Sequence, residues 1–321
     1  METSAKTTAD TMTAEEKEAA EKAEAEKAAE EAKKTAAIID GKAIAQVVKD
    51  ELKSKVAAAS EGKSRKPGLA VVLVGENPAS KAYVKSKIAA CKAVGIESFL
   101  IELPTDTAAS AVADTVRKLN SDETVDGILV QLPLPKHISS TEILALIDPG
   151  KDVDGLTAVN AGLLMQGDDG LFPCTPLGVM RLLEQHGVSL KGKQAVVVGR
   201  SHLVGKPLAM MLLQKDATVT ICHSKTANLP EVCRQADVLV AACGQPEMVK
   251  GSWVKAGAVV IDVGINRVED AEGKSRLVGD VAYDEACRSA YLITPVPGGV
   301  GPMTVAMLLS NTLRAYIGRQ K

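Results

Sequence analysis

Aromatic side chains are scarce in this sequence, which has two Phe, one Trp and four Tyr among 321 residues. Proteins that bind single-stranded nucleic acids stack bases on such rings, so this chain lacks the material for that function. The net charge of −2 also offers no basic surface for nucleic acid or an anionic membrane. Since no run of 18 apolar residues occurs, we expect neither nucleic acid nor a membrane as a partner.

Clustered metal ligands are also lacking. The six cysteines form no C-x-x-C pair, and the four histidines form no H-x-x-x-H or Cys/His cluster. The sequence therefore predicts no metal site. Scattered cysteines are typical of reduced, mostly buried thiols in a reducing compartment. The expected location is the cytoplasm, with an organelle as the alternative.

Residues 1–36 differ in composition from the rest, with 10 acidic and 6 basic side chains among Ala and Thr. No apolar signal segment is present, and the acidity argues against a transit peptide. Pairs such as Glu18 and Lys22 favour a helix, yet Ala supplies most of the apolar surface. We interpret 1–36 as a charged tail, disordered or a lone helix, and an interaction helix is the alternative.

From Ile38 onward, apolar strands alternate with helical patterns, which indicates an α/β fold with parallel sheets. The buried strand Leu69–Gly75 is followed by Asn77-Pro78, a cap and first-turn pair that opens a helix. Further on, 127–131 is another strand, and the polar loop 151–155 is a plausible domain junction. The length is sufficient for two domains with separate cores.

A strand, a glycine turn and a helix follow one another at residues 194–213. Gly199 allows a sharp turn, and Gly205 begins a helix whose free N–H groups suit a pyrophosphate. The pattern is G-x-S-x-x-x-G rather than G-x-G-x-x-G. A purely structural turn is therefore the alternative.

The next strand indicates which dinucleotide this turn would bind. An NAD site expects a carboxylate about 20 residues on, but this strand ends in Cys222-His223-Ser224-Lys225. Arg200 adjoins the turn glycine, and guanidinium binds phosphate bidentately. This combination favours NADP over NAD. The alternative is that Arg200 and Lys225 are ordinary solvated charges.

The helix that begins after Asn77 carries Ser80, Tyr83 and Lys87 on one face. Its start lies at the carboxyl end of a strand, where open α/β sheets place ligands, and Gln131 ends another such strand. A lysine near a pocket can move protons, and Tyr83 can stack on a flat ligand. From these residues alone, a solvated Lys87 is the better interpretation. The Tyr-x-x-x-Lys spacing also occurs in short-chain dehydrogenases, but their glycine turn precedes the pair, whereas here it follows.

Several long motifs occur together and in order. They are VGENPASKAYVKSKIAACKAVGI (74–96), GILVQLPLP (127–135), KDVDGLTAVNAG (151–162), FPCTPLGVM (172–180), VVVGRSHLVGKP (196–207), TICHSKT (220–226), VVIDVGIN (259–266) and TPVPGGVGPMT (294–304). Over residues 37–321 the chain resembles the bifunctional methylenetetrahydrofolate dehydrogenase/cyclohydrolase family.

The resemblance implies a two-domain α/β fold with a cleft between the domains. An N-terminal α/β catalytic domain would span 37–155 and include a returning C-terminal helix at about 301–321. A Rossmann-type NADP-binding domain would span 156–300, and homodimers would pair through it.

The resemblance also implies roles for individual residues. Lys87 would be the working catalytic residue beside Tyr83, Gln131 would tune it, and Asp154 would hold the pterin. The cofactor would contact Gly199, Arg200, Ser201, Ser224 and Ile265. The folate would contact Ser80, Tyr83, Asp154 and the closing loop Pro297, Gly298, Gly299 and Val300.

The implied chemistry belongs to folate one-carbon metabolism, which serves purine biosynthesis. Hydride would pass from 5,10-methylenetetrahydrofolate to NADP, and the 5,10-methenyl product would be hydrolysed to 10-formyltetrahydrofolate. Lys87 would manage the protons of hydrolysis. The alternatives are a monofunctional dehydrogenase on the same fold and a non-catalytic NADP-binding sensor.

Overall fold

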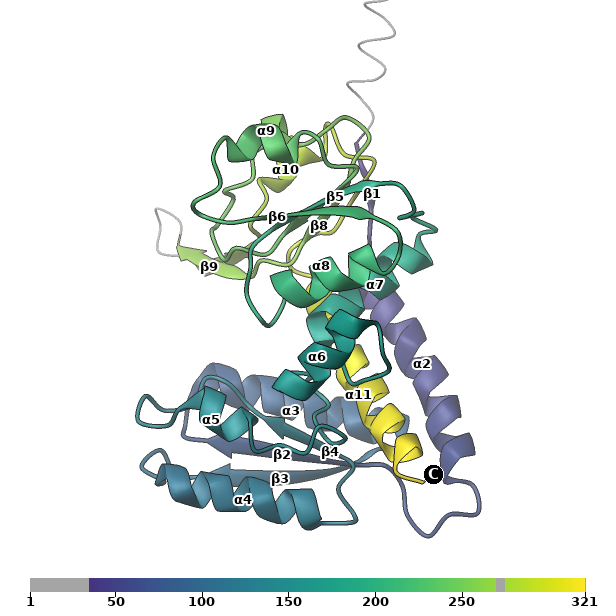
Figure 1. Cartoon of the computed structure of the whole chain (residues 1–321), viewed down its shortest axis with the longest axis vertical. Coiled ribbons are helices and arrows are strands. Elements are labelled where there is room, and N and C mark those ends of the chain that lie inside the picture. The colour runs from purple at the N-terminus through teal and green to yellow at the C-terminus, as the bar shows by residue number, and fades with distance from the viewer. Residues whose placement is uncertain (1–34, 270–274, 321) are drawn as a thin grey trace, which may run out of the picture.

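The computed structural model describes residues 35–269 and 275–320, and the predicted tail lies almost wholly outside them. Figure 1 shows two α/β bodies, one above the other, joined by long helices. One body holds a three-stranded sheet and the other a six-stranded sheet. The predicted α/β class is confirmed. Within the described ranges, no helix is both long enough and apolar enough to cross a membrane.

The smaller sheet is parallel, in the order β3-β2-β4. Its elements are β2 (Gly68–Val74), α3 (Pro78–Val94), β3 (Glu97–Leu103), α4 (Ala109–Ser121), β4 (Gly127–Val130) and α5 (Ser140–Leu144). Every residue of the central strand β2 is buried, which explains its uninterrupted apolar run.

The helix boundaries of this body follow the predicted caps. The Asn77 side chain accepts a hydrogen bond from the Ser80 N–H at 3.1 Å, and α3 begins at the next residue. Gly95 ends the helix in the left-handed region, with a φ of 87°. Ser139 caps α5 in the same way as Asn77 caps α3. All three signals are local, which is why the sequence is sufficient to identify them.

The larger sheet is also parallel, in the order β1-β11-β8-β7-β5-β6. Its strands are β1 (Ala37–Ile38), β5 (Gln194–Val198), β6 (Thr218–Cys222), β7 (Val238–Ala241), β8 (Val259–Asp262) and β11 (Leu292–Ile293). Around it lie α8 (Gly205–Leu213), α9 (Leu229–Cys233), η1 (Gly251–Trp253), α10 (Tyr283–Ala286) and the hairpin β9 (Asn266–Glu269) and β10 (Ser275–Val278).

The start of the chain differs from the expected domain division. The expected division places residues 37–38 in the first domain, whereas the structure pairs them with β11 in the larger sheet. Both residues of β1 are exposed, and Ile38 keeps 58% of its surface. A two-residue edge strand has no pattern of its own, so only its neighbour decides where it pairs.

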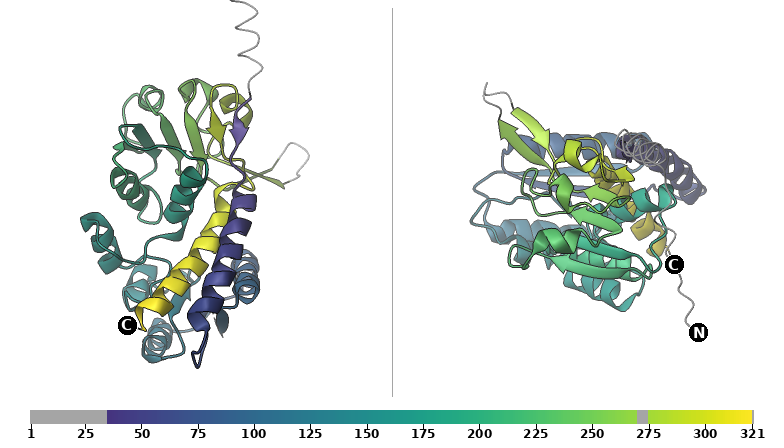
Figure 2. Two further views of the ribbon diagram at one scale, coloured as in Figure 1. Left: turned by 90° about the vertical axis from the view of Figure 1, so that its right-hand side faces the viewer. Right: turned by 90° about the horizontal axis from the view of Figure 1, so that it is seen from above.

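Two long helices connect the bodies and lie side by side in both figures (Figures 1 and 2). They are α2 (Gly41–Ser60) and α11 (Val300–Gly318). Helix α11 also packs on α7 (Cys174–Gln185), and α6 (Ala158–Gln166) lies between the bodies. Because α11 is covered on several sides, its sequence is apolar nearly all round.

The far end of α11 is fixed to the smaller body by Tyr316. Its hydroxyl donates to the Arg65 carbonyl at 3.0 Å, and the Arg65 guanidinium lies 5.1 Å from its ring centre. The same guanidinium binds buried Asp126 bidentately at 2.6 and 2.8 Å. The C-terminal helix thus returns to the body that contains α3 and β4.

Candidate active site

Lys87 and Gln131 contact each other directly. The Lys87 Nζ donates to the Gln131 Oε1 at 3.0 Å, across from α3 to the residue that follows β4. The Gln131 Nε2 donates to its neighbouring Leu132 carbonyl at 2.6 Å, so the amide oxygen is the atom that faces the lysine. Lys87 is half-buried and is therefore not the freely solvated lysine of the alternative interpretation.

The loop that carries Asp154 is more buried than its polar sequence suggests. Asp152 pairs with Ile128, so the loop runs beside β4. Buried Lys151 donates to the carbonyls of Leu119 and Asp122 at 2.9 and 2.7 Å. These carbonyls lie at the end of α4, where a cation is favourable. Lys151 therefore ties the loop to the end of α4, and the predicted junction is buried although its sequence is polar.

Asp154 lies in this buried environment within reach of the charge of Lys87. Burial raises the pKa of the Asp154 carboxyl, while the Lys87 charge acts in the opposite direction. The thiol of Cys174, at the start of α7, lies beside it, and burial raises the pKa of that thiol well above its usual range. The nearby carboxylate of Asp152 also raises the pKa of Asp154, so Asp154 lies among one cation, one thiol and one further carboxylate.

The other two residues of the predicted α3 face differ in exposure. Ser80 is 4% exposed, whereas Tyr83 keeps 53% of its surface. Tyr83 precedes Lys87 by about one helical turn, so its ring lies at the surface beside the lysine. This position leaves the ring free to stack on a flat molecule.

The predicted cofactor turn requires glycine at two positions. Gly199 has a φ of 132°, and a Cβ there would overlap the carbonyl oxygen of Ala242. A Cβ on Gly205 would overlap the carbonyl of Gly199 itself. Gly199 therefore lets the turn approach the residue after β7, and Gly205 lets the start of α8 approach the turn.

Ser201 stands where the standard pattern has its second glycine. Its hydroxyl accepts hydrogen bonds from the N–H groups of Val204 and Gly205 at 3.1 and 3.5 Å. The serine thus provides an acceptor for two donors at the start of α8, a position where backbone N–H groups have no partner within the helix. This explains how G-x-S replaces G-x-G without loss of the turn.

A cavity of about 700 Å³ opens beside this turn. Gly199, Arg200 and Ser201 form one wall, Ser224 and its neighbours a second, and residues 242–248 a third. Four of the five predicted cofactor residues therefore line one space. The third wall was not predicted from the sequence. These residues follow the carboxyl end of β7, a third parallel strand, and ligands of α/β sheets bind at such strand ends, so their position could have indicated them.

Ile265 and the loop 297–300 lie at a different place, at the start of α11. Ile265 is 51% exposed, and a Cβ on Gly301 would lie 3.5 Å from its Cδ1. Gly298, with a φ of 108°, accepts a hydrogen bond from the Lys42 N–H at 3.0 Å. Within the described ranges, no hydrogen bond joins this loop to Lys87.

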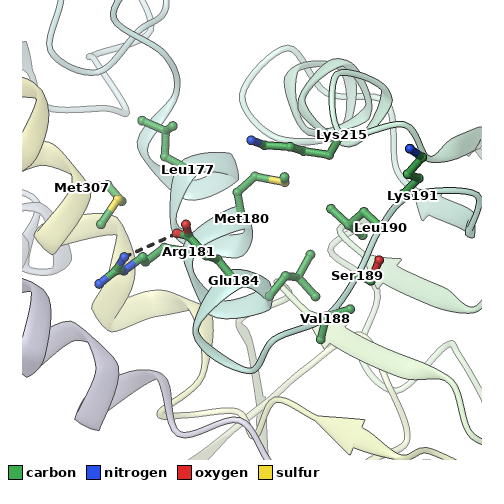
Figure 3. Close-up of a pocket in the computed structure, with 11 residues that line it drawn as sticks. Leu177, Met180, Arg181, Glu184, Val188, Ser189, Leu190, Lys191, Lys215 and Met307 are labelled. Carbon is green, nitrogen blue, oxygen red and sulfur yellow. Dashed lines mark hydrogen bonds and ion pairs between the residues drawn. The ribbon is translucent and has the colours of Figure 1, made fainter.

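A second cavity, of about 510 Å³, contains none of the predicted residues. Figure 3 shows it beside α7, with the ion pair Arg181–Glu184 at its edge and Met307 of α11 nearby. Residues 188–191 and Lys215 complete the lining.

The described part of the chain holds no group of three His, Cys, Asp or Glu side chains suited to a metal ion. All six cysteines lie in this part and are free thiols, four of them buried.

Two family models match the chain. The catalytic domain of tetrahydrofolate dehydrogenase/cyclohydrolase matches residues 39–154, and the NAD(P)-binding domain of the same enzyme matches residues 173–320. The chain belongs to the tetrahydrofolate dehydrogenase/cyclohydrolase family. The resemblance stated from the motifs is therefore confirmed.

Similar proteins of this family cover nearly the whole described chain. The bifunctional protein FolD of Azorhizobium caulinodans is 60% identical over 277 residues, which are 86% of this chain and 96% of that protein. The crystal structure of the Campylobacter jejuni FolD enzyme is 47% identical, with a TM-score of 0.84 over 88% of this chain and 99% of its own. The Trypanosoma brucei enzyme, solved with NADP and an inhibitor, is 43% identical, with a TM-score of 0.84 over 89% and 99%.

Proposed function

We propose that this chain oxidises 5,10-methylenetetrahydrofolate with NADP and hydrolyses the resulting 5,10-methenyltetrahydrofolate to 10-formyltetrahydrofolate. The observation that carries the proposal is the match to both family models, in order, over residues 39–154 and 173–320. Relatives named as bifunctional proteins are 53–60% identical to it over 86–87% of the chain. The hydrogen bond between Lys87 and Gln131 provides independent support.

The cavity beside Gly199 fits NADP. Its glycine-lined turn provides a close approach to backbone N–H groups, as a pyrophosphate requires. Arg200 and Ser224 both line it, and its described lining includes no Asp or Glu that would repel a 2′-phosphate. NADP supplies the hydride chemistry when bound, and the protein orients the two reacting rings.

Lys87 would serve the hydrolytic step. Water adds to the methenyl carbon and the bond from that carbon to N5 breaks. The added oxygen releases both of its protons, one of which is taken up by N5 while the other leaves to solvent. The Gln131 oxygen holds one hydrogen of the Lys87 amine, which directs the remaining hydrogens elsewhere. Lys87 thus moves protons at the reacting carbon, Tyr83 stacks on the pterin, and Asp154 binds it.

The domain division and the assembly form part of the same proposal. The catalytic domain comprises about 39–155 with the helix at 301–321, and the NADP-binding domain comprises about 156–300 together with β1 (Ala37–Ile38), which pairs in its sheet. We propose a cytoplasmic homodimer that pairs through the larger sheet. Strand β6 is an edge of that sheet, and its Ile221 is 37% exposed. Sedimentation at micromolar concentration tests this, because a monomer there contradicts it.

Separate assays of the two steps test the proposed function. Wild type should reduce NADP much faster than NAD with methylenetetrahydrofolate, and should hydrolyse methenyltetrahydrofolate supplied directly. Arg200→Ala should raise the KM for NADP about tenfold, since one charge-assisted contact is removed. Lys193→Ala is the matched control, because Lys193 precedes β5 at the opposite end of the strand.

Each assay has an outcome that contradicts one part of the proposal. Equal use of NAD and NADP by wild type refutes the cofactor. Oxidation without hydrolysis identifies a monofunctional dehydrogenase. NADP binding without either activity identifies the sensor.

A further inference from the structure

The third wall of the NADP cavity is held by a carboxylate that does not line the cavity. Asp280 is completely buried, and its Oδ2 accepts the N–H groups of Cys243 and Gly244 at 2.7 and 2.9 Å. Its Oδ1 accepts the N–H of Gln245 at 2.9 Å. Three consecutive backbone donors therefore converge on one side chain, directly after β7.

The same carboxylate also holds the segment that follows β8. The Asn266 Nδ2 donates to the Asp280 Oδ1 at 2.9 Å and to the Gly279 carbonyl at 3.2 Å. Asn266 is the neighbour of Ile265, which we assigned to the cofactor from the resemblance. Asp280 thus ties together the carboxyl ends of two adjacent strands, where α/β sheets bind their ligands.

Asp280 is itself fixed by a second buried carboxylate, Asp262. The Asp262 Oδ1 accepts the Asp280 N–H, and its Oδ2 accepts the Val281 N–H, both at 2.9 Å. A Cβ on Gly264 would overlap the Asp280 carboxylate, and one on Gly279 would overlap that of Asp262. The side chains therefore fit their space closely, and Asp280 has little freedom to move.

We propose that Asp280 is a positioning residue for NADP binding, acting through the loop 243–245. This inference rests on the proposed function of the cavity. Gln245 lines the cavity, and the direction of its side chain depends on backbone that Asp280 holds. Both side-chain oxygens at this position must accept hydrogen bonds from N–H groups, and only a carboxylate has two such oxygens. In an asparagine, the amide NH2 would replace one of these oxygens and face backbone N–H groups that are also donors.

Asp280→Asn tests the inference, with Asp126→Asn as the matched control. Both aspartates are completely buried and both accept backbone N–H bonds, but Asp126 does so in the smaller sheet, from Gly68. Asp280→Asn should raise the KM and the Kd for NADP about tenfold, because at least one backbone donor loses its partner. Hydrolysis of methenyltetrahydrofolate, supplied without NADP, should stay within about twofold of wild type. Asp126→Asn should leave the KM for NADP unchanged.

Three outcomes decide the question, with folding checked by circular dichroism. A wild-type KM for NADP in folded Asp280→Asn overturns the inference, and so does an equal loss of both activities in the two variants. Wild type that fails to reduce NADP refutes the proposed function instead.

If Asp280→Asn does not fold, Asn266→Ala provides a second test, because it removes one of the four hydrogen bonds that the Asp280 carboxylate accepts. A rise of about threefold in the KM for NADP of Asn266→Ala supports the inference, whereas an unchanged KM overturns it.

Discussion

Lys87 is one of four lysines on α3, and its neighbours differ from it in their surroundings. Lys81 pairs with exposed Glu76, while Lys85 is itself exposed. Lys87 is half-buried and donates a hydrogen bond to Gln131, which lies directly after β4. A solvated lysine is common and a lysine held by an amide near a half-buried carboxylate is not, so the surroundings rather than the residue type distinguish Lys87.

Replacement of Lys87 by methionine should abolish hydrolysis. Methionine keeps a similar unbranched shape but cannot move a proton, and positioned proton transfer contributes about 10²–10⁴-fold to rate. Methenyltetrahydrofolate hydrolysis should therefore fall by at least about 10²-fold, while the Kd for NADP changes by less than about twofold. Lys85→Met on the same helix is the control and should hydrolyse normally. Normal hydrolysis by Lys87→Met would remove Lys87 from the mechanism.

At the scale of elements, the cofactor turn depends on how closely β5 and α8 approach each other. Gly199 and Gly205 meet backbone rather than flexible side chains, so the surroundings cannot yield to a new methyl group. The Ser201 hydroxyl completes the turn by accepting hydrogen bonds from the N–H groups of Val204 and Gly205. The turn is thus closely packed by backbone and held by its own hydrogen bonds.

Gly205→Ala should damage this unit. The added methyl would overlap the Gly199 carbonyl, so urea unfolding should show a loss of about 1–3 kcal/mol, and NADP affinity should fall as well. Gly162→Ala in α6 is the matched control, because nothing lies within 4 Å of its Cβ position. Since alanine favours helix over glycine, Gly162→Ala should stabilise the protein by up to about 1 kcal/mol. Equal changes in the free energy of unfolding for the two substitutions would contradict the close approach of Gly205 to the Gly199 carbonyl.

At the scale of the whole molecule, α11 links the two bodies close to the candidate site. Buried Asn311 donates to the carbonyls of Val153 and Phe172, both at 2.8 Å. These carbonyls lie in the segments that lead to Asp154 and to α7. The helix therefore fixes the loop that presents Asp154, although it lies at the other end of the sequence.

The stability of the whole molecule should depend on the proton of Asp262. Burial raises the pKa of Asp262 from 3.8 to about 7, against three backbone N–H bonds that lower it. The folded state then binds this proton more tightly than the unfolded state. The favourable contribution is complete below about pH 4 and is lost as the pH rises through about 7. Between these two values, each increase of one in pH removes about 1.4 kcal/mol from the free energy of unfolding.

Urea unfolding of wild type and Asp262→Asn between pH 4.5 and pH 8 measures this effect. Asparagine does not titrate, so the free energy of unfolding of wild type relative to the variant should decrease as the pH rises. A difference that is constant over this range would show that Asp262 does not hold its proton there.

By itself the sequence determined the local structure and the family. Asn77, Gly95 and Ser139 end or begin helices through contacts within about four residues, and apolar runs identify buried strands. The order of the motifs identified the family, and the turn at Gly199 was visible as strand, glycine and helix. Such features are encoded by neighbouring residues, so reading along the chain is sufficient.

The tertiary structure alone decided which distant residues meet. Lys87 and Gln131 are 44 residues apart, and Asp280 is 35–37 residues from the backbone it holds. The pairing of β1 with β11 and the burial of the loop at Lys151 likewise depend on neighbours from elsewhere in the chain. A buried carboxylate and a solvated one look the same in sequence, because the difference lies in which donors the folded chain brings to its oxygens.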